Sequence, residues 1–177
     1  MRRPARAQPP DVEVFLVRHA IAHERDRTRW PNDALRPLTA EGKKKFRKAA
    51  RGLAHCLPRG AVLLTSPFTR ARETAAILAA ATRGPKAVEC EQLAAGAPVE
   101  LAFELLRGRR EKAVVLVGHE PHLSTWMSAA LAGGHARLKI EFKKGGAACL
   151  DFEKRVEPGG ATLRWMLPPR TLRELAR

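Results

Sequence analysis

The chain has 177 residues, of which 45% are hydrophobic, and a formal net charge of +15 from 33 Lys and Arg against 18 Asp and Glu. This length and composition suit one globular domain with a sizeable core and exclude a low-complexity chain. Aromatic residues make up only 5%, with no tyrosine, so a dedicated nucleic-acid surface built on base stacking is disfavoured and only nonspecific binding is expected.

Cysteine spacing and hydropathy favour a cytoplasmic protein. Cys56, Cys90 and Cys149 are odd in number and widely separated, which argues against a disulfide framework or a zinc cluster and favours free thiols in a reducing cytosol. No apolar run approaches the roughly 18 residues of a membrane span, and no secretory signal precedes the domain, so no membrane partner is expected. We expect residues 1–10 to form a disordered basic arm and residues 11–177 a single domain.

The first predicted strand covers residues 12–17, a β-branched and apolar run that stops at a charged residue. Residues 24–37 mix charges with proline, which indicates a long surface loop. A helix is expected to start at Thr39, whose hydroxyl can cap it. Its buried stripe is predicted to contain Phe46, Ala49, Ala50, Leu53 and Leu57.

The next unit is a short buried strand over residues 61–65 followed by a helix. Ser66 and Pro67 are interpreted as the N-cap and the first helical residue, and the helix continues through Arg70 to about Thr82. Arg70 is therefore expected close to the end of the strand.

The third quarter of the chain repeats this alternation. A weak strand is predicted over residues 87–90 and a helix over residues 98–107. Residues 113–117 are continuously apolar, as in a central parallel strand covered on both faces. Pro121 is expected to open the helix that follows, which closes at Gly133.

The last third contains two strand-like runs, residues 147–152 and 161–167, joined by a turn at Pro158-Gly159-Gly160. Strands that alternate with helices and end in a hairpin predict an α/β fold. We expect a three-layer α/β/α sandwich around a mixed, mostly parallel sheet with a C-terminal hairpin and no helical cap domain.

Polar residues follow three of the predicted strands. Arg18 and His19 come directly after the first, Arg70 lies in the first turns after the second, and His119 follows the central strand. The ends of neighbouring strands converge on one crevice in an α/β protein, so these four side chains can meet there. Two guanidinium groups and two imidazoles around one point predict a phosphate site that contains a nucleophile.

Each residue type suits one part of phosphoryl transfer. Arg18 and Arg70 can hold phosphate oxygens in pairs, because the guanidinium fork matches them. His19 is the predicted nucleophile, since a neutral imidazole can carry the phosphoryl group covalently. His119 would donate to the phosphate oxygens as charge develops. A lone histidine at a strand end is more often a purely structural polar group, but two of them beside two arginines favour a site.

Other phosphate chemistries fail on spacing. Cys56 is not followed by arginine six residues later, a P-loop is absent, and His119 and His122 lie one residue too close for the H-E-x-x-H zinc pattern. Clustered aspartates for magnesium are also lacking. We expect neither a metal nor a cofactor.

Four segments in order resemble motifs of the histidine phosphatase superfamily, most closely the SixA-type phosphohistidine phosphatases. Residues 16–20 (LVRHA) resemble the R-H-G motif, residues 36–42 (RPLTAEG) the L-T-x-x-G helix entry, residues 65–74 (TSPFTRARET) the S-P-x-x-R-A-x-x-T motif, and residues 118–121 (GHEP) the second-histidine motif. This resemblance implies that His19 is phosphorylated, with Arg18, Arg70 and His119 binding the phosphate. It also implies a phosphoglycerate mutase-like fold over about residues 12–170 without a cap.

The chain departs from this pattern at two points. Ala20 replaces the glycine that usually follows the histidine, which restricts the backbone there. The carboxylic acid with which many relatives protonate the leaving group has no clear counterpart. Glu91 and Glu100 are the weak candidates, and each is more readily interpreted as a surface carboxylate.

A site without this acid suits a leaving group that needs little protonation. A positioned acid is worth typically about 10²–10⁴-fold, and phosphohistidine releases an imidazole, which is a far weaker base than an alkoxide. The leading hypothesis is therefore a phosphatase acting on phosphohistidine in a protein. A phosphatase of small phosphate esters or polyphosphate-like anions is the second hypothesis, and a non-catalytic phosphate-binding module is the third.

Overall fold

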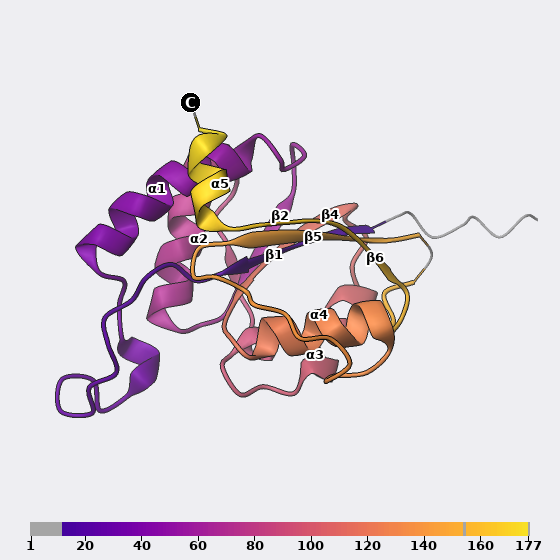
Figure 1. Cartoon of the computed structure of the whole chain (residues 1–177), viewed down its shortest axis with the longest axis horizontal. Coiled ribbons are helices and arrows are strands. Elements are labelled where there is room, and N and C mark those ends of the chain that lie inside the picture. The colour runs from indigo at the N-terminus through magenta and orange to yellow at the C-terminus, as the bar shows by residue number, and fades with distance from the viewer. Residues whose placement is uncertain (1–11, 154, 177) are drawn as a thin grey trace, which may run out of the picture.

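The computed structural model describes residues 12–153 and 155–176, so the predicted basic arm lies outside the described residues. A six-stranded sheet in the order β3-β2-β4-β1-β5-β6 has helices on both faces (Figure 1). The strands are β1 Val12–Arg18, β2 Val62–Thr65, β3 Val88–Glu89, β4 Ala113–Gly118, β5 Ala147–Phe152 and β6 Ala161–Leu167. The helices are α1 Ala40–Ala54, α2 Thr69–Thr82, α3 Val99–Arg107, α4 His122–Ala132 and α5 Pro169–Glu174, with short 3-10 helices η1 Asp33–Leu35 and η2 Glu91–Leu93.

The sheet is mixed, as predicted. β3, β2, β4 and β1 are parallel, whereas β5 pairs antiparallel with both β1 and β6. β4 lies between β2 and β1 and is buried along its whole length, which explains its uninterrupted apolar sequence. The predicted C-terminal hairpin of β5 and β6 is confirmed.

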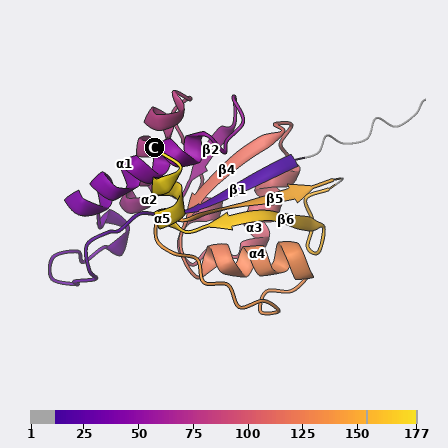
Figure 2. The ribbon, with the colours of Figure 1, turned by 45° about the horizontal axis from the view of Figure 1, so that its top comes forward.

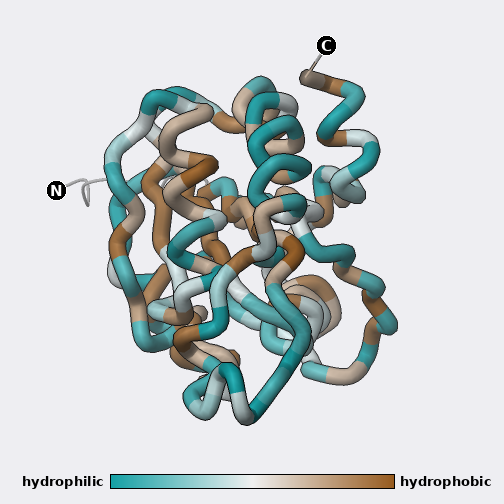
Figure 3. The backbone as a smooth tube through the Cα atoms, turned by 90° about the vertical axis from the view of Figure 1, so that its left-hand side faces the viewer, coloured by the Kyte–Doolittle hydropathy of each residue, from teal (hydrophilic) through white to brown (hydrophobic). Residues whose placement is uncertain are grey.

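The two faces of the sheet are covered by different helices. α1, α2 and α5 lie on one face, and α3 and α4 lie on the other (Figures 1 and 2). Alternating residues of β1 enter the two cores, with Phe15 and Val17 facing α1 and α2, and Val14 and Leu16 facing α3 and α4. Hydrophobic colours accordingly concentrate on the inner strands, and the long loop before α1 is hydrophilic (Figure 3). The three-layer sandwich is confirmed.

α1 begins where the sequence predicts it. The Thr39 hydroxyl accepts a hydrogen bond from the Gly42 amide at 2.9 Å. Gly42 is required here because a Cβ on it would lie only 2.1 Å from the Ile21 carbonyl oxygen. The predicted stripe is buried from Phe46 to Leu53, whereas Leu57 lies beyond the end of the helix.

The start of α2 corrects one prediction. Ser66 and Pro67 were expected as N-cap and first helical residue, but the helix begins at Thr69 with Phe68 in the cap position. The Ser66 hydroxyl lies 2.7 Å from His119 Nε2 and also accepts a hydrogen bond from the Phe68 amide at 3.3 Å, just before the helix. α5 is a short helix that the sequence analysis did not predict.

Two features of the described residues bear on the surroundings of the site. In residues 12–153 and 155–176, every helix is one of those named above, and none of them forms an additional cap over the carboxyl ends of the strands. Within the same residues, every helix is too short or too polar to traverse a bilayer.

Candidate active site

Strand register places the two site histidines side by side. In the parallel pair β1–β4, Val17 is opposite Val117 and Arg18 is opposite Gly118. The residues that follow are His19 and His119, and the His19 amide donates to the Gly118 carbonyl at 3.0 Å. Their ring centroids are 5.1 Å apart. The predicted convergence of His19 and His119 follows from this register.

His19 is held as a neutral imidazole. It is 7% exposed, and its Nδ1 lies 2.7 Å from the carbonyl oxygen of Ala20. Nδ1 must carry the proton to donate to that carbonyl, which leaves the lone pair on Nε2. Burial, reinforced by Arg70 and Arg18, lowers the pKa of His19 to about 3. The ring is therefore unprotonated on Nε2 at neutral pH, as the predicted nucleophile must be.

His119 is oriented by Ser66. The Ser66 hydroxyl follows β2 and lies 2.7 Å from His119 Nε2, and the ring of Phe68 packs against the imidazole with centroids 5.1 Å apart. Burial and the neighbouring His19 lower the pKa of His119 to about 2, so this ring is neutral as well. If Ser66 donates to Nε2, Nδ1 carries the hydrogen and can donate to an oxyanion.

Arg70 is fixed by Asp33, a residue the sequence analysis did not single out. Arg70 is 3% exposed; its Nη1 donates to the Asp33 carbonyl at 2.8 Å and its Nη2 lies 3.1 Å from Asp33 Oδ2. Its guanidinium also stands 5.0 Å from the Phe68 ring centroid. The side chain is thus held on two sides at the start of α2.

Asp33 also binds a third arginine. Arg36 Nε donates to Asp33 Oδ1 at 2.8 Å, and Arg36 Nη1 donates to the His23 carbonyl at 2.6 Å. These contacts close the loop before α1 beside the histidines. The hydrogen bond from Arg36, with the charge of Arg70, holds the pKa of Asp33 below its ordinary value, so the carboxylate is ionised.

Arg18, the last residue of β1, is anchored by a backbone carbonyl of the segment before β5. Its Nη1 donates to the carbonyl of Phe142, and its charge acts on both His19 and Glu120. The buried side-chain nitrogens without a hydrogen-bond partner among the described residues include one on each of three predicted site residues, namely Arg18 Nε, Arg70 Nε and His119 Nδ1. An unpaired buried donor costs about 1–3 kcal/mol, so an accepting oxyanion would be favoured here.

Ala20 is accommodated without strain at the position where the resemblance implies glycine. Its amide donates to the Thr74 hydroxyl at 3.0 Å, and that hydroxyl donates to the Arg70 carbonyl at 2.7 Å. Ala20 is buried and its φ is not positive. Thr74 therefore ties the segment after His19 to the helix that carries Arg70.

The two candidate acids are not part of this constellation. Glu91 is exposed in η2 and makes no hydrogen bond or ion pair with the four predicted site residues. Glu100 is exposed at the start of α3, where it pairs with His135 at 3.0 Å. Glu120, beside His119, accepts a hydrogen bond from the Ser124 amide.

Sequence reasoning missed Asp33, Arg36 and the site role of Ser66. Two signals could have revealed them: Asp33 and Arg36 are three residues apart at the entry to the L-T-x-x-G segment, and Ser66 opens the segment that contains Arg70. Among residues 12–153 and 155–176, no group of three or more His, Cys, Asp or Glu side chains could hold a metal ion. All three cysteines are free thiols.

The α/β fold and the paired histidines between arginines define a phosphate-handling class of protein. The sequence profile of the Histidine phosphatase superfamily (branch 1) matches residues 14–95. An uncharacterized protein of Picosynechococcus sp. is 37% identical over 139 residues, covering 76% of this chain and 82% of that protein. The chain belongs to the histidine phosphatase superfamily.

Solved structures agree with this family. The protein histidine phosphatase SixA in complex with tungstate has a TM-score of 0.75 at 23% identity, over 91% of this chain and 99% of that chain. A protein from Agrobacterium tumefaciens assigned to the SixA phosphohistidine phosphatases has a TM-score of 0.72 at 27% identity, over 90% and 99%. A mycobacterial glucosyl-3-phosphoglycerate phosphatase has a TM-score of 0.66 at 14% identity, over 89% and 100%. The chain is thus of the SixA type within the superfamily.

Proposed function

We propose that this protein is a cytoplasmic phosphatase that removes the phosphoryl group from phosphohistidine in a protein partner, through a covalent intermediate on His19. The observation that carries this proposal is the neutral His19 imidazole, with its lone pair on Nε2, 5.1 Å from the neutral His119 ring. Arg18 and Arg70 would hold the phosphate oxygens, and His119 Nδ1 would donate to them.

The reaction divides into two displacements. His19 Nε2 attacks phosphorus, the P–N bond of the substrate breaks, and the departing imidazole takes a proton from solvent. Water then attacks the phosphorus on His19, the new P–N bond breaks, and inorganic phosphate leaves while the ring returns to its neutral form. The arginines neutralise the charge of the phosphoryl oxygens in both steps.

The choice of a P–N bond rests on where the carboxylates lie. Glu91 is exposed without a contact to the site and Glu100 pairs with His135, so neither is positioned as an acid for an alkoxide leaving group. The site also lacks a helical cap among the described residues, which leaves room for a side chain that protrudes from a protein. Both observations support phosphohistidine over a buried sugar phosphate.

Small phosphorylated molecules are the second candidate substrate class. The mycobacterial phosphatase with the same fold acts on glucosyl-3-phosphoglycerate. The net charge of +15 on this chain attracts small anions as well as phosphorylated proteins. The mechanism on His19 would be unchanged. A strong preference for such esters over a phosphohistidine protein would overturn the first choice of substrate.

The experiment has two parts. Brief incubation with ³²P-labelled phosphohistidine protein, followed by alkaline quenching, should trap an acid-labile label on the wild type but not on His19→Ala. His55→Ala, which changes an exposed histidine at the end of α1, is the matched control and should label like the wild type. Full turnover by His19→Ala would contradict the mechanism, and wild-type protein without any hydrolysis would indicate a binding module.

A further inference from the structure

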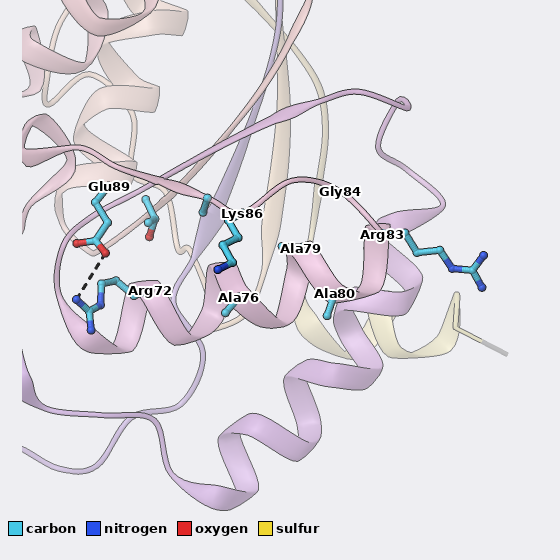
Figure 4. A pocket seen from close by; sticks show the side chains of 10 residues that line it. Arg72, Ala76, Ala79, Ala80, Arg83, Gly84, Lys86 and Glu89 are labelled. Carbon is cyan, nitrogen blue, oxygen red and sulfur yellow. Dashed lines mark ion pairs between the residues drawn. The ribbon is translucent and has the colours of Figure 1, made fainter.

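A basic groove runs along the outer side of α2 and is lined by none of the four predicted site residues. It has a volume of about 580 Å³ between α2 and the edge strand β3. Its floor is formed by small side chains, and its charged lining is Arg72, Arg83, Lys86 and Glu89. Figure 4 shows Arg72 paired with Glu89 at one end, Arg83 at the other and Lys86 between them. The groove is therefore open and mainly cationic.

A second hollow of about 430 Å³ adjoins the groove across the same helix. Ala76 and Ala80 line both, and Arg47 and Arg51 of α1 complete the second. We name Arg47, Arg51, Arg83 and Lys86 the α2 basic surface. All four are exposed, and within the described residues none of them forms an ion pair with a carboxylate. Their charges are thus available to a partner.

The groove begins beside the proposed site. Thr65 lines it, and the next residue, Ser66, orients His119. Arg72 stands two residues after Arg70 on α2, and the rise of about 1.5 Å per residue makes the helix from Arg72 to Arg83 roughly 16 Å long. A bound chain could therefore extend from the phosphate site along α2.

β3 supplies a further contact. It is the edge strand next to β2, its two residues are exposed, and Val88 is 54% exposed. The outer backbone groups of an edge strand can pair with an added chain. A segment in the groove would meet these groups on one side and the alanines of α2 on the other.

We propose that the α2 basic surface docks an acidic segment of the phosphorylated protein substrate. This inference rests on the proposed function. Four unpaired cations around an apolar alanine floor match a peptide that carries Asp or Glu and small apolar side chains. A nucleic acid fits less well, because the lining of both hollows contains no aromatic side chain on which a base could stack.

The test compares a protein and a small substrate. The protein is an acidic histidine-containing phosphotransfer domain phosphorylated on histidine, and the small substrate is phosphoramidate. Reversing all four charges (Arg47→Glu, Arg51→Glu, Arg83→Glu and Lys86→Glu) should raise KM for the phosphoprotein about tenfold or more, with kcat and phosphoramidate turnover within about twofold. Two exposed cations of the opposite face, Lys139→Glu and Arg155→Glu, form the control and should leave both substrates unaffected.

The outcomes separate the two proposals. A wild-type protein that hydrolyses phosphoramidate but not the phosphoprotein overturns the proposed function together with the docking surface. A wild type active on both, with an unchanged phosphoprotein KM in the quadruple variant, overturns docking alone. If the variant instead loses only the binding of a single-stranded oligonucleotide, measured by fluorescence anisotropy, the surface binds nucleic acid and the inference is wrong.

Discussion

The two faces of the sheet are packed by different kinds of residue. The face under α3 and α4 is filled by large side chains, with Trp126 between Phe103 and Phe152 at ring-centroid distances of 4.9 and 6.1 Å. The face under α1, α2 and α5 is rich in alanine and brings backbones close together, as at Gly42. The proposed site lies on the alanine-rich side. Large side chains thus supply hydrophobic burial on one face, and close backbone packing fixes the residues of the proposed site on the other.

The largest expected effect would test the first half of this comparison. Trp126→Ala removes the centre of the aromatic cluster and should lower the free energy of unfolding by about 3–5 kcal/mol. Because Trp126 lies on the far face, kcat/KM of the folded fraction should remain near that of the wild type. Urea unfolding and activity below the transition measure both. A loss of activity without a loss of stability would contradict the division between the faces.

Asp33→Asn should affect activity rather than stability. The amide cannot neutralise both Arg70 and Arg36, so Arg70 loses a charge-assisted hydrogen bond and its fixed position. A loss of about 1.5–3 kcal/mol in transition-state stabilisation corresponds to roughly a 10–150-fold fall in kcat/KM. The affinity for tungstate, measured as competitive inhibition, should fall with it.

Glu174→Gln is the control for this positioning role. It neutralises an exposed carboxylate that pairs with Arg170 on α5, and such surface pairs contribute little. Unchanged tungstate affinity in Asp33→Asn would show that Asp33 does not position Arg70 for the oxyanion.

A smaller effect is expected where the alanine-rich face is tightest. Gly42→Ala places a Cβ 2.1 Å from the Ile21 carbonyl, so the segment after His19 or the start of α1 must move. Overpacking of this kind costs about 1–3 kcal/mol. Gly108→Ala is the matched control, because a Cβ there meets no atom within 4 Å and the φ of −79° suits alanine. Equal thermal stability of the two variants would contradict the close packing at Gly42.

The smallest effect concerns pH. The pKa of His19 is about 3 in the folded chain against an ordinary 6.5, so between these values the unfolded chain binds a proton that the native chain does not. The contribution of the neutral His19 to the free energy of unfolding should therefore be fully present above pH 6.5. It should decrease as the pH falls from 6.5 towards 3, by at most about 1.4 kcal/mol per pH unit for each such histidine. His19→Gln should show a shallower decline of melting temperature from about pH 7 to about pH 5. An identical slope in both proteins would contradict a buried neutral His19.

The alternation of strands and helices could be predicted because it depends on periodicity. β4, for example, is recognisable from its unbroken apolar run, and α1 from Thr39 and the stripe after it. The start of α2 could not be predicted, since a serine followed by proline has the composition of a helix N-terminus whether the helix begins there or, as here, only at Thr69. α5 is too short to show a helical period.

The proposed site, like the fold, could be predicted only in part from the sequence. His19, His119 and Arg70 were found because they follow strands whose ends must meet. Asp33 lies in a loop with no periodicity, and its contact with Arg70 depends on how residues 24–37 fold back onto α2. The catalytic roles of His19, His119 and Arg70 are predictions that the experiments above address.

The one-to-one alignment of β1 with β4 couples correct folding to chemistry. Side chains alternate along a strand, so a slip of a single residue between these two would turn one imidazole toward the α3 and α4 face while its partner stayed behind. A misaligned molecule could keep a nearly intact sheet and still be inert. The fraction of molecules active in phosphoryl transfer would then equal the fraction in which β1 and β4 are paired in the correct register.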